Sequence, residues 1–139
     1  MLVNRNINVC LVSDLFENYP LSENTIVVVV DLLRATTVIS TAFNFGVKEI
    51  IPVSSLEIAK RYLDKKDYIV AAERNAMPIE GFDYGNSPFQ YMNNEILDKT
   101  LVLTTTNGTK AINIASEYEV ITSCFINIDA VEELLLNSK

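Results

Sequence analysis

The chain has 139 residues, the size of one ordinary domain, so a multidomain machine is excluded. Apolar residues make up 49% of the sequence and charged residues 21%, a balance that is typical of globular proteins and excludes wholesale disorder. Eleven basic against eighteen acidic residues give a net charge of −7. No nucleic-acid partner is therefore expected, because such partners require a concentrated basic surface.

Histidine is absent from the sequence, which removes Ser-His and Cys-His nucleophile pairs, imidazole bases and His-ligated zinc sites. The two cysteines, Cys10 and Cys124, lie in apolar stretches and match neither a zinc site nor a redox CxxC motif, so we expect two buried thiols. No run of about eighteen apolar residues occurs, so no membrane-spanning segment is expected. Together these features predict a cytoplasmic protein in a reducing compartment.

The first third of the chain alternates β-rich and helical patterns. Ile7–Val12 can form a first strand. The run TIVVVV at Thr25–Val30 predicts a strand that is buried on both faces of a parallel sheet. Apolar residues at helical spacing from Ala35 to Phe43 predict one helix face, and Gly46 follows where a helix end favours a left-handed residue.

The same alternation continues to the end of the chain. Strands are predicted at Lys48–Val53, Tyr68–Ala72, Leu101–Thr104 and Glu119–Ser123, with a long irregular stretch at Glu73–Pro88. Helices are predicted after Ser54 or Ser55 as the N-cap, over the apolar stripe Ala111 to Tyr118, and from Asp129 as a cap through Leu136.

Alternating strands and helices are typical of right-handed βαβ units. We therefore expect residues 1–139 to form a single α/β domain with a three-layer α/β/α architecture and a mostly parallel sheet. The last helix carries an apolar stripe without any obvious closing element, which suits a fold cut short.

The unusual polar residues follow three of the predicted strands. Asp31, Arg34, Thr36 and Thr37 follow TIVVVV, Glu73 and Arg74 follow YIVAA, and Thr105–Thr109 follow LVLT. In an open parallel sheet, ligands bind beyond the carboxyl ends of the strands. The sequence therefore predicts that these three segments form one site.

Each segment also has a purely structural interpretation. Arg34 can pair with Asp31 while Thr36 caps the helix, or Asp31 is a magnesium ligand or nucleophile and Arg34 with the helix N-terminus binds an anion. Glu73 and Arg74 can form an ordinary solvated ion pair at a strand end, and Asp83 can form an Asx-turn in a fixed loop.

The segment TTTNGT has the same two interpretations. It can be a polar turn in which Asn107 or Thr109 caps the next helix. Its hydroxyls, backbone N–H groups and helix dipole can equally bind phosphate or sulfonate. Neither GxxxxGK[ST] nor GxGxxG occurs, so a nucleotide-binding domain lacks its usual motifs.

Three segments, VVVVDLLRATT, AERNAMPIEGFDYGNSP and LTTTNGTKA, occur in the order found in the 2-phosphosulfolactate phosphatase family, which the chain closely resembles from about Ile26 to Ala130. The resemblance implies a magnesium-dependent phosphomonoesterase that hydrolyses phosphosulfolactate to sulfolactate in coenzyme M synthesis. Family members run further, so the chain resembles their N-terminal part. Ala72 also stands where the family usually has glycine, which narrows the space there.

The resemblance implies a set of site residues from four motifs. They are Asp31, Arg34, Thr36 and Thr37, then Glu73 and Arg74, then Asp83, Asn86 and Ser87, and finally Thr105, Thr106, Asn107, Gly108 and Thr109. We expect Asp31, Arg34, Glu73 and Arg74 to be catalytic, and Asp31, Glu73 and Asp83 to bind Mg²⁺. The remaining residues are expected to bind a small anionic phosphorylated substrate.

A mechanism follows from this assignment. The phosphate is placed at Arg34, Thr36 and Thr37 and a second anion near Thr106 to Thr109, with Arg74 neutralising the nearer one. Direct attack by water is preferred to a phosphoaspartyl intermediate on Asp31, because Leu33 stands where haloacid-dehalogenase-type phosphatases have a second Asp. The alternative function is a non-catalytic anion-binding or assembly domain, and an exposed apolar edge would favour a homo-oligomer.

Overall fold

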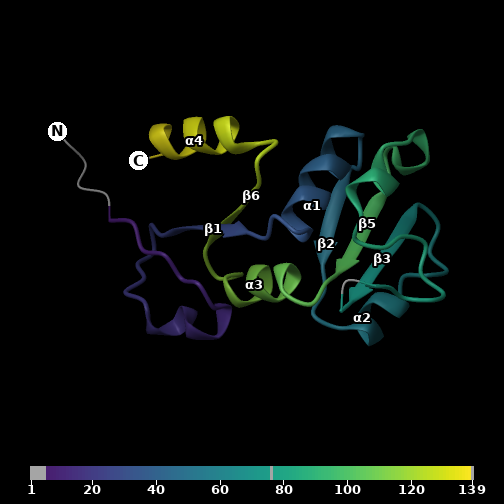
Figure 1. The fold of residues 1–139 in the computed structure, drawn as a ribbon, viewed down its shortest axis with the longest axis horizontal. Helices are drawn as coiled ribbons and strands as arrows, with labels where there is room; N and C mark the ends of the chain where they lie inside the picture. The colour runs from purple at the N-terminus through teal and green to yellow at the C-terminus, as the bar shows by residue number, and fades with distance from the viewer. Residues whose placement is uncertain (1–5, 76, 139) are drawn as a thin grey trace.

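The computed structural model describes residues 6–75 and 77–138. Strands and helices alternate along this part of the chain (Figure 1), as the sequence predicts. The strands are β1 (Ile26–Val30), β2 (Glu49–Pro52), β3 (Tyr68–Arg74), β4 (Met77–Pro78), β5 (Thr100–Thr104) and β6 (Glu119–Ser123). The α-helices are α1 (Ala35–Asn44), α2 (Leu56–Lys60), α3 (Gly108–Ile114) and α4 (Ile128–Asn137), and the 3₁₀ helices are η1 (Ser13–Asn18), η2 (Pro88–Tyr91) and η3 (Asn94–Ile96).

The strands form two sheets among the described residues. β1 pairs in parallel with β6, and the second sheet has the order β2-β5-β3-β4. All pairs in the second sheet are parallel except β3–β4, so the expected mostly parallel sheet is confirmed. The sheet is divided, however, because no hydrogen-bonded ladder joins β1 to β2 in the described part of the chain.

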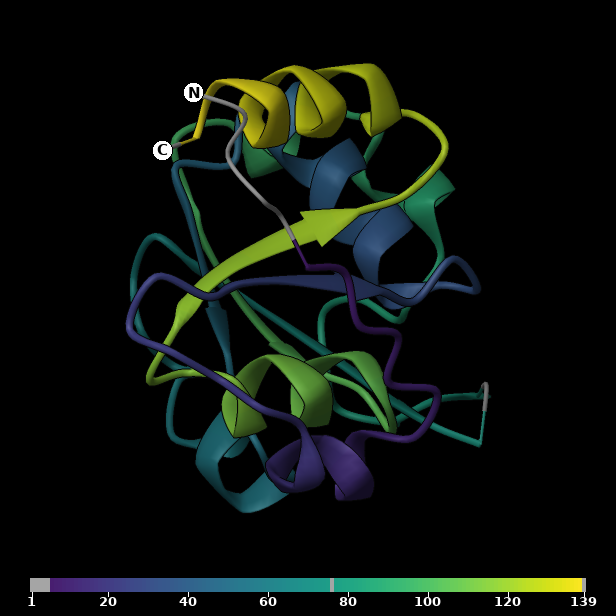
Figure 2. The same cartoon turned by 90° about the vertical axis from the view of Figure 1, so that its left-hand side faces the viewer.

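Helices cover both sides of the strands. Figure 2 shows α1 and α4 on one side and α2, α3 and η1 on the other, which is the expected α/β/α layering. Two apolar clusters lie against the four-stranded sheet. One joins α1 and η2 to strand residues such as Leu101 and Leu103, and the other joins α2 to Val70 and Val102.

The valine-rich strand β1 is less buried than the sequence predicts. Val29 is buried, but Val27 and Val28 are only half-buried and Val30 is 60% exposed. No residue of β1 or β6 belongs to either apolar cluster. The prediction of burial on both faces is therefore wrong, because β1 lies in a two-stranded sheet that is separate from the larger one.

Helix α1 ends as its sequence predicts. Val38, Ile39 and Ala42 lie on its buried face, whereas Phe43, which the apolar spacing also places on that face, is 50% exposed. Gly46 has φ +93°, and its backbone N–H donates to the Phe43 carbonyl, which turns the chain toward β2. Ser55 is confirmed as the cap of α2, because its hydroxyl oxygen accepts a hydrogen bond of 3.2 Å from the Ile58 N–H.

Other predictions near the ends of the described chain are wrong. Ile7–Val12 is not a strand, since no neighbouring strand pairs with it in the described residues, and Ile7 and Leu11 are about nine-tenths exposed. Cys10 is only half-buried, whereas Cys124 is buried as expected. Asp129 lies inside the first turn of α4, and Asn127 occupies the position before the helix.

The segment between β3 and β5 is fixed by aromatic packing. Tyr84 forms a parallel bridge with Ala71 of β3, and its ring stacks on that of Tyr91 at a centroid distance of 5.3 Å. The buried Tyr91 hydroxyl donates a hydrogen bond of 2.7 Å to the Gly85 carbonyl. Because Glu73 and Arg74 belong to β3, the irregular stretch begins later than the sequence predicts.

We predict that Tyr91→Phe lowers the free energy of unfolding by about 1–3 kcal/mol, because the buried Gly85 carbonyl then loses its donor. Chemical denaturation measures the change. Tyr19→Phe is the matched control, since the Tyr19 hydroxyl donates to the Val9 carbonyl at the exposed surface and its loss should cost less than about 0.5 kcal/mol. Equal losses in the two variants would contradict the prediction.

Tyr91 should also make stability depend on pH. Burial raises the pKa of Tyr91 above its ordinary value of 10.0, so the folded state retains a proton that the unfolded state releases. This stability is fully present below pH 10.0 and is lost as the pH rises toward the folded-state pKa. Above pH 10.0, the free energy of unfolding of the wild type should therefore fall more steeply with rising pH than that of Tyr91→Phe. Chemical denaturation at a series of pH values measures the difference.

Candidate functional site

Three strand ends meet at one edge of the molecule. Asp31 follows β1, Glu73 and Arg74 end β3, and Thr104 ends β5. Register places β3 and β5 side by side, with Ala72 opposite Thr104. The end of β1 reaches this edge through helix packing instead, because Gly108 at the start of α3 lies directly against Ala35 and Asp31.

The start of α3 can lie this close to Asp31 and Ala35 because Gly108 has no side chain. A methyl group at this position would overlap the Ala35 Cβ and lie 2.8 Å from Asp31 Oδ2. Both Gly108 and Ala35 are buried, so neither segment has room to move away. The contact therefore fixes the Asp31 carboxylate beside the loop that follows β5.

The turn from β1 into α1 is closed by its own polar groups. The Asp31 N–H donates to Thr36 Oγ1 at 3.1 Å, and the Thr36 N–H donates to the Asp31 carbonyl at 3.0 Å. The Thr37 hydroxyl donates to the Leu32 carbonyl at 2.8 Å. Thr36 and Thr37 thus hold the turn together, while Arg34 lies half-buried directly before α1.

The loop after β5 is closed in the same way. The Thr105 N–H donates to Thr109 Oγ1 at 3.0 Å, and the Thr109 N–H donates to Thr105 Oγ1 at 3.1 Å. Asn107 precedes α3 but makes no side-chain cap hydrogen bond. Two of the groups expected to bind an anion, Thr105 and Thr109, are therefore already hydrogen-bonded to each other within the loop. The hydroxyl of the exposed Thr106 points out of the loop toward Glu73.

Glu73 and Arg74 are not a solvated ion pair. Arg74 donates from Nη1 to the Glu73 carbonyl at 2.6 Å and from Nη2 to Thr104 Oγ1 at 3.0 Å. The Glu73 side chain is buried, and Thr106 Oγ1 lies 3.4 Å from Glu73 Oε1. The guanidinium is held in place across the ends of two strands, and a buried carboxylate lies next to it along the chain.

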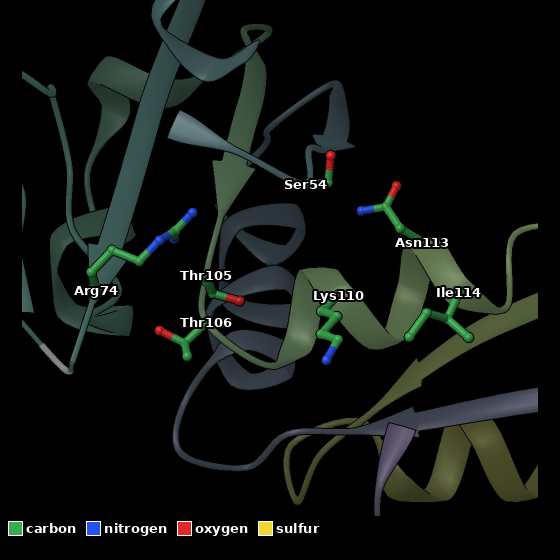
Figure 3. A pocket seen from close by; sticks show the side chains of 7 residues that line it. All are labelled: Ser54, Arg74, Thr105, Thr106, Lys110, Asn113 and Ile114. Atoms are coloured by element: carbon green, nitrogen blue, oxygen red, sulfur yellow. The ribbon is translucent and has the colours of Figure 1, made fainter. Parts of the chain in front are cut away.

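A cleft of about 430 Å³ opens beside these strand ends. In Figure 3, Arg74 reaches toward the end of β5 from one side, and residues of α3 line the other. The lining residues are Ser54, Arg74, Thr105, Thr106, Lys110, Asn113 and Ile114. The sequence-based prediction missed Ser54, Lys110 and Asn113, although the last two share with Ile114 the helical spacing of one α3 face.

Lys110 makes an ion pair at the surface. Its Nζ lies 2.5 Å from Asp14 Oδ1 of η1, and the two side chains are 49% and 64% exposed. Asn113 Nδ2 donates to the Thr109 carbonyl at 2.7 Å. The cleft therefore combines one cation held by two hydrogen bonds, one exposed cation in a surface ion pair and several hydroxyl or amide groups, a set that suits an anionic ligand.

The three expected metal ligands do not come together. In the described residues, no group of three His, Cys, Asp or Glu side chains is placed to hold a metal ion. Asp83 is exposed, and its Oδ2 accepts a hydrogen bond of 2.9 Å from the Val70 N–H, at the middle of β3. Glu73 lies three residues further along that strand, about 10 Å away at the usual rise per residue.

Asn86 has a polar atom without a partner. The residue is buried, and its Oδ1 accepts no hydrogen bond from any residue that the structure describes. A buried carbonyl oxygen in this state is costly unless a donor or a cation reaches it. Ser87, which follows, is half-buried and precedes η2. Neither residue lines the cleft, so their expected contact with substrate stays a prediction.

Comparisons with known proteins agree on one family. The profile described as 2-phosphosulpholactate phosphatase matches residues 10–139. A probable 2-phosphosulfolactate phosphatase of Caldanaerobacter subterraneus subsp. tengcongensis is 47% identical over 116 residues, which cover 81% of this chain and 48% of that protein. A protein of the same name from Clostridium tetani is 42% identical over 137 residues, covering 96% of this chain and 58% of that protein. The chain spans about half the length of the curated relatives it matches.

We predict that Gly108→Ala lowers the free energy of unfolding by about 1–3 kcal/mol, because the added methyl group must push α3 away from Ala35 and Asp31. Backbone amide NMR signals should shift in both the Asp31–Thr36 turn and α3. Asn107→Ala serves as the control, since this exposed neighbour makes no cap hydrogen bond and should change stability by less than about 0.5 kcal/mol. Unchanged signals at the Asp31–Thr36 turn would show that Gly108 does not join the two segments.

Proposed function

Because the chain belongs to the 2-phosphosulpholactate phosphatase family, we propose that it binds a small phosphorylated hydroxy acid at this edge and hydrolyses the phosphate ester. The substrate named for its relatives, 2-phosphosulfolactate, is the first candidate. The observation that carries the proposal is the convergence of Asp31, Glu73 and Arg74 around the loop after β5. Acidic and cationic groups are thereby combined at the carboxyl ends of parallel strands.

The phosphate is assigned to Arg74 and Thr106, rather than to Thr36 and Thr37. The hydroxyl of Thr36 accepts from, and that of Thr37 donates to, the backbone of their own turn. Arg74 is held by two hydrogen bonds and lines the cleft, so it can neutralise phosphoryl oxygens without first becoming ordered. Thr106 lies on the same wall and offers a hydroxyl.

The carboxylates are assigned to proton transfer, since the chain contains no histidine. A water oxygen attacks the phosphorus, the bond from phosphorus to the ester oxygen breaks, and the leaving oxygen takes a proton to become the hydroxyl of the product. Asp31 or Glu73 accepts a proton from the attacking water, and this proton is the one that passes to the leaving oxygen. Leu33 offers no second acid to an Asp31 nucleophile, so direct attack remains the preferred route.

The proposal includes Mg²⁺ bound by two of the three expected carboxylates, Asp31 and Glu73. Asp31 and Glu73 both lie against the Thr106–Gly108 loop, and Mg²⁺ commonly uses one or two carboxylates together with substrate oxygens and water. Asp83 is left out because the Val70 N–H holds its carboxylate elsewhere. When bound, the ion would supply Lewis-acid polarisation of the phosphoryl group.

A second candidate function is anion binding without turnover. It is favoured by the position of Asp83, one of the three carboxylates expected to bind Mg²⁺, which is held at the middle of β3 by the Val70 N–H. The same cleft and the same cations would then hold the phosphorylated acid without hydrolysing it. Measured phosphate release, compared with measured binding, separates the two candidates.

We predict that Asp31→Asn lowers the rate of phosphate release from small phosphorylated acids by about 10²–10⁴-fold, as expected for loss of a group that transfers protons. Release is followed colorimetrically with and without Mg²⁺. Asp83→Asn is the control, because its amide oxygen can still accept from the Val70 N–H and the residue lies outside the site. Full activity of Asp31→Asn would remove this residue from the mechanism.

The route of attack gives a separate prediction. In a single turnover with ¹⁸O-labelled water, we expect the label to appear in the released phosphate, because water attacks phosphorus directly. Mass spectrometry of the phosphate and of a tryptic digest reads the outcome. Label that appears first in the Asp31 carboxylate would instead establish a phosphoaspartyl intermediate.

A further inference from the structure

Lys110 is the second cation of the cleft, and the proposed hydrolysis does not use it. Arg74 and Lys110 are the two cations among the lining residues of a chain whose net charge is −7. Lys110 lies on the face of α3 that also carries Asn113 and Ile114, so its stem is part of the cleft wall. A second cation away from the first is what a ligand with two anionic groups requires.

The two cations differ in how they are held. Arg74 is fixed by hydrogen bonds to the Glu73 carbonyl and to Thr104. Lys110 makes an ion pair with Asp14, and Figure 3 shows its amine pointing away from Asn113 and Ser54. An exposed ion pair of this kind contributes little and is screened by salt. A lysine side chain is also flexible, so its amine can exchange one anion for another.

We propose that Lys110 determines specificity by binding a second anionic group of the ligand, and that Asp14 competes with that group for its amine. The inference rests on the proposed function in one respect, the placement of the phosphate at Arg74. The expected ligand is a small molecule with a phosphate ester and a second acidic group a short distance from it, as in phosphoglycolate. The second acidic group of such a ligand forms an ion pair with Lys110 by displacing Asp14. A phosphate ester without a second acidic group leaves the ion pair between Lys110 and Asp14 intact.

The segment that carries Asp14 has a second anchor. Phe16 of η1 packs edge-on against Tyr118 with a centroid distance of 6.0 Å. η1 should therefore stay in place when the ion pair is removed, and variants of Lys110 and Asp14 should keep their fold. Circular dichroism and the NMR signals of β3 and β5 check this point before binding is measured.

The experiment compares two probes that differ in one group. Phosphoglycolate carries a phosphate and a carboxylate, and ethyl phosphate has the same two-carbon skeleton with the phosphate alone. NMR titration of the ¹⁵N-labelled chain at low salt gives a dissociation constant for each probe. The wild type should bind phosphoglycolate more tightly, and Lys110→Met, which keeps the length of the side chain, should reduce that preference about tenfold while leaving ethyl phosphate binding unchanged.

Asp14→Asn tests the competition. It should strengthen phosphoglycolate binding about two- to fivefold, the size of an exposed ion pair, without strengthening ethyl phosphate binding to the same extent. Glu17→Gln is the matched control, because it removes one negative charge from the same 3₁₀ helix. In the double variant Asp14→Asn/Lys110→Met, the gain should disappear.

Each outcome decides the proposal independently of turnover. A preference for phosphoglycolate that survives in Lys110→Met, or equal gains in Asp14→Asn and Glu17→Gln, would overturn it. Equal weakening of both probes by Lys110→Met would assign this residue to the phosphate instead. Absence of binding by either probe would overturn the anion cleft itself. Binding of phosphoglycolate without any release of phosphate from 2-phosphosulfolactate would leave the inference standing and refute the proposed hydrolysis.

Discussion

The close contact between Gly108 and the turn at Asp31 and Ala35 is the constraint on which the site depends. The strands that contribute most of the polar residues, β3 and β5, are joined by a regular parallel ladder. The strand that contributes Asp31 lies in the other sheet, and no ladder between the described residues connects the two. Helix packing brings its carboxylate to the shared edge, since α1 packs on the larger sheet and α3 lies against the turn that precedes α1. The close approach of α3 requires a residue without a side chain at its first position.

Much of the fold could be predicted because its signals are local. The apolar spacing of α1, the left-handed glycine after it and the serine cap of α2 each depend on a few neighbouring residues, and all three are confirmed. The burial of β1 depends on which strands lie beside it. Its run of valines is the same in a central strand and in a two-stranded sheet, so the sequence could not distinguish the two.

The site shows the same limit. The alternation of strands and helices and the rule for ligands at strand ends were enough to predict that Asp31, Arg74 and Thr106 lie at one edge. They could not show that Thr36 and Thr109 are engaged within their own turns, or that Asp83 is held at the middle of β3. These outcomes depend on which of several chemically similar hydroxyl and carboxylate groups lies within hydrogen-bonding distance of the backbone in the folded chain.

The division of the sheet also bears on local unfolding, that is, on which strands expose their amide hydrogens to solvent most readily. β3 and β5 lie between two apolar clusters, whereas β1 and β6 belong to neither, and α4 buries little beyond Val131. Amide hydrogens of β3 and β5 should then exchange with deuterated water only on global unfolding, and those of β1 and β6 through smaller local fluctuations. Asp31 directly follows β1 and Arg74 ends β3, so the two strands that carry the site are expected to differ in protection. The close contact between Gly108 and Asp31 is then what couples the weakly buried β1 to the core strands that carry the rest of the site.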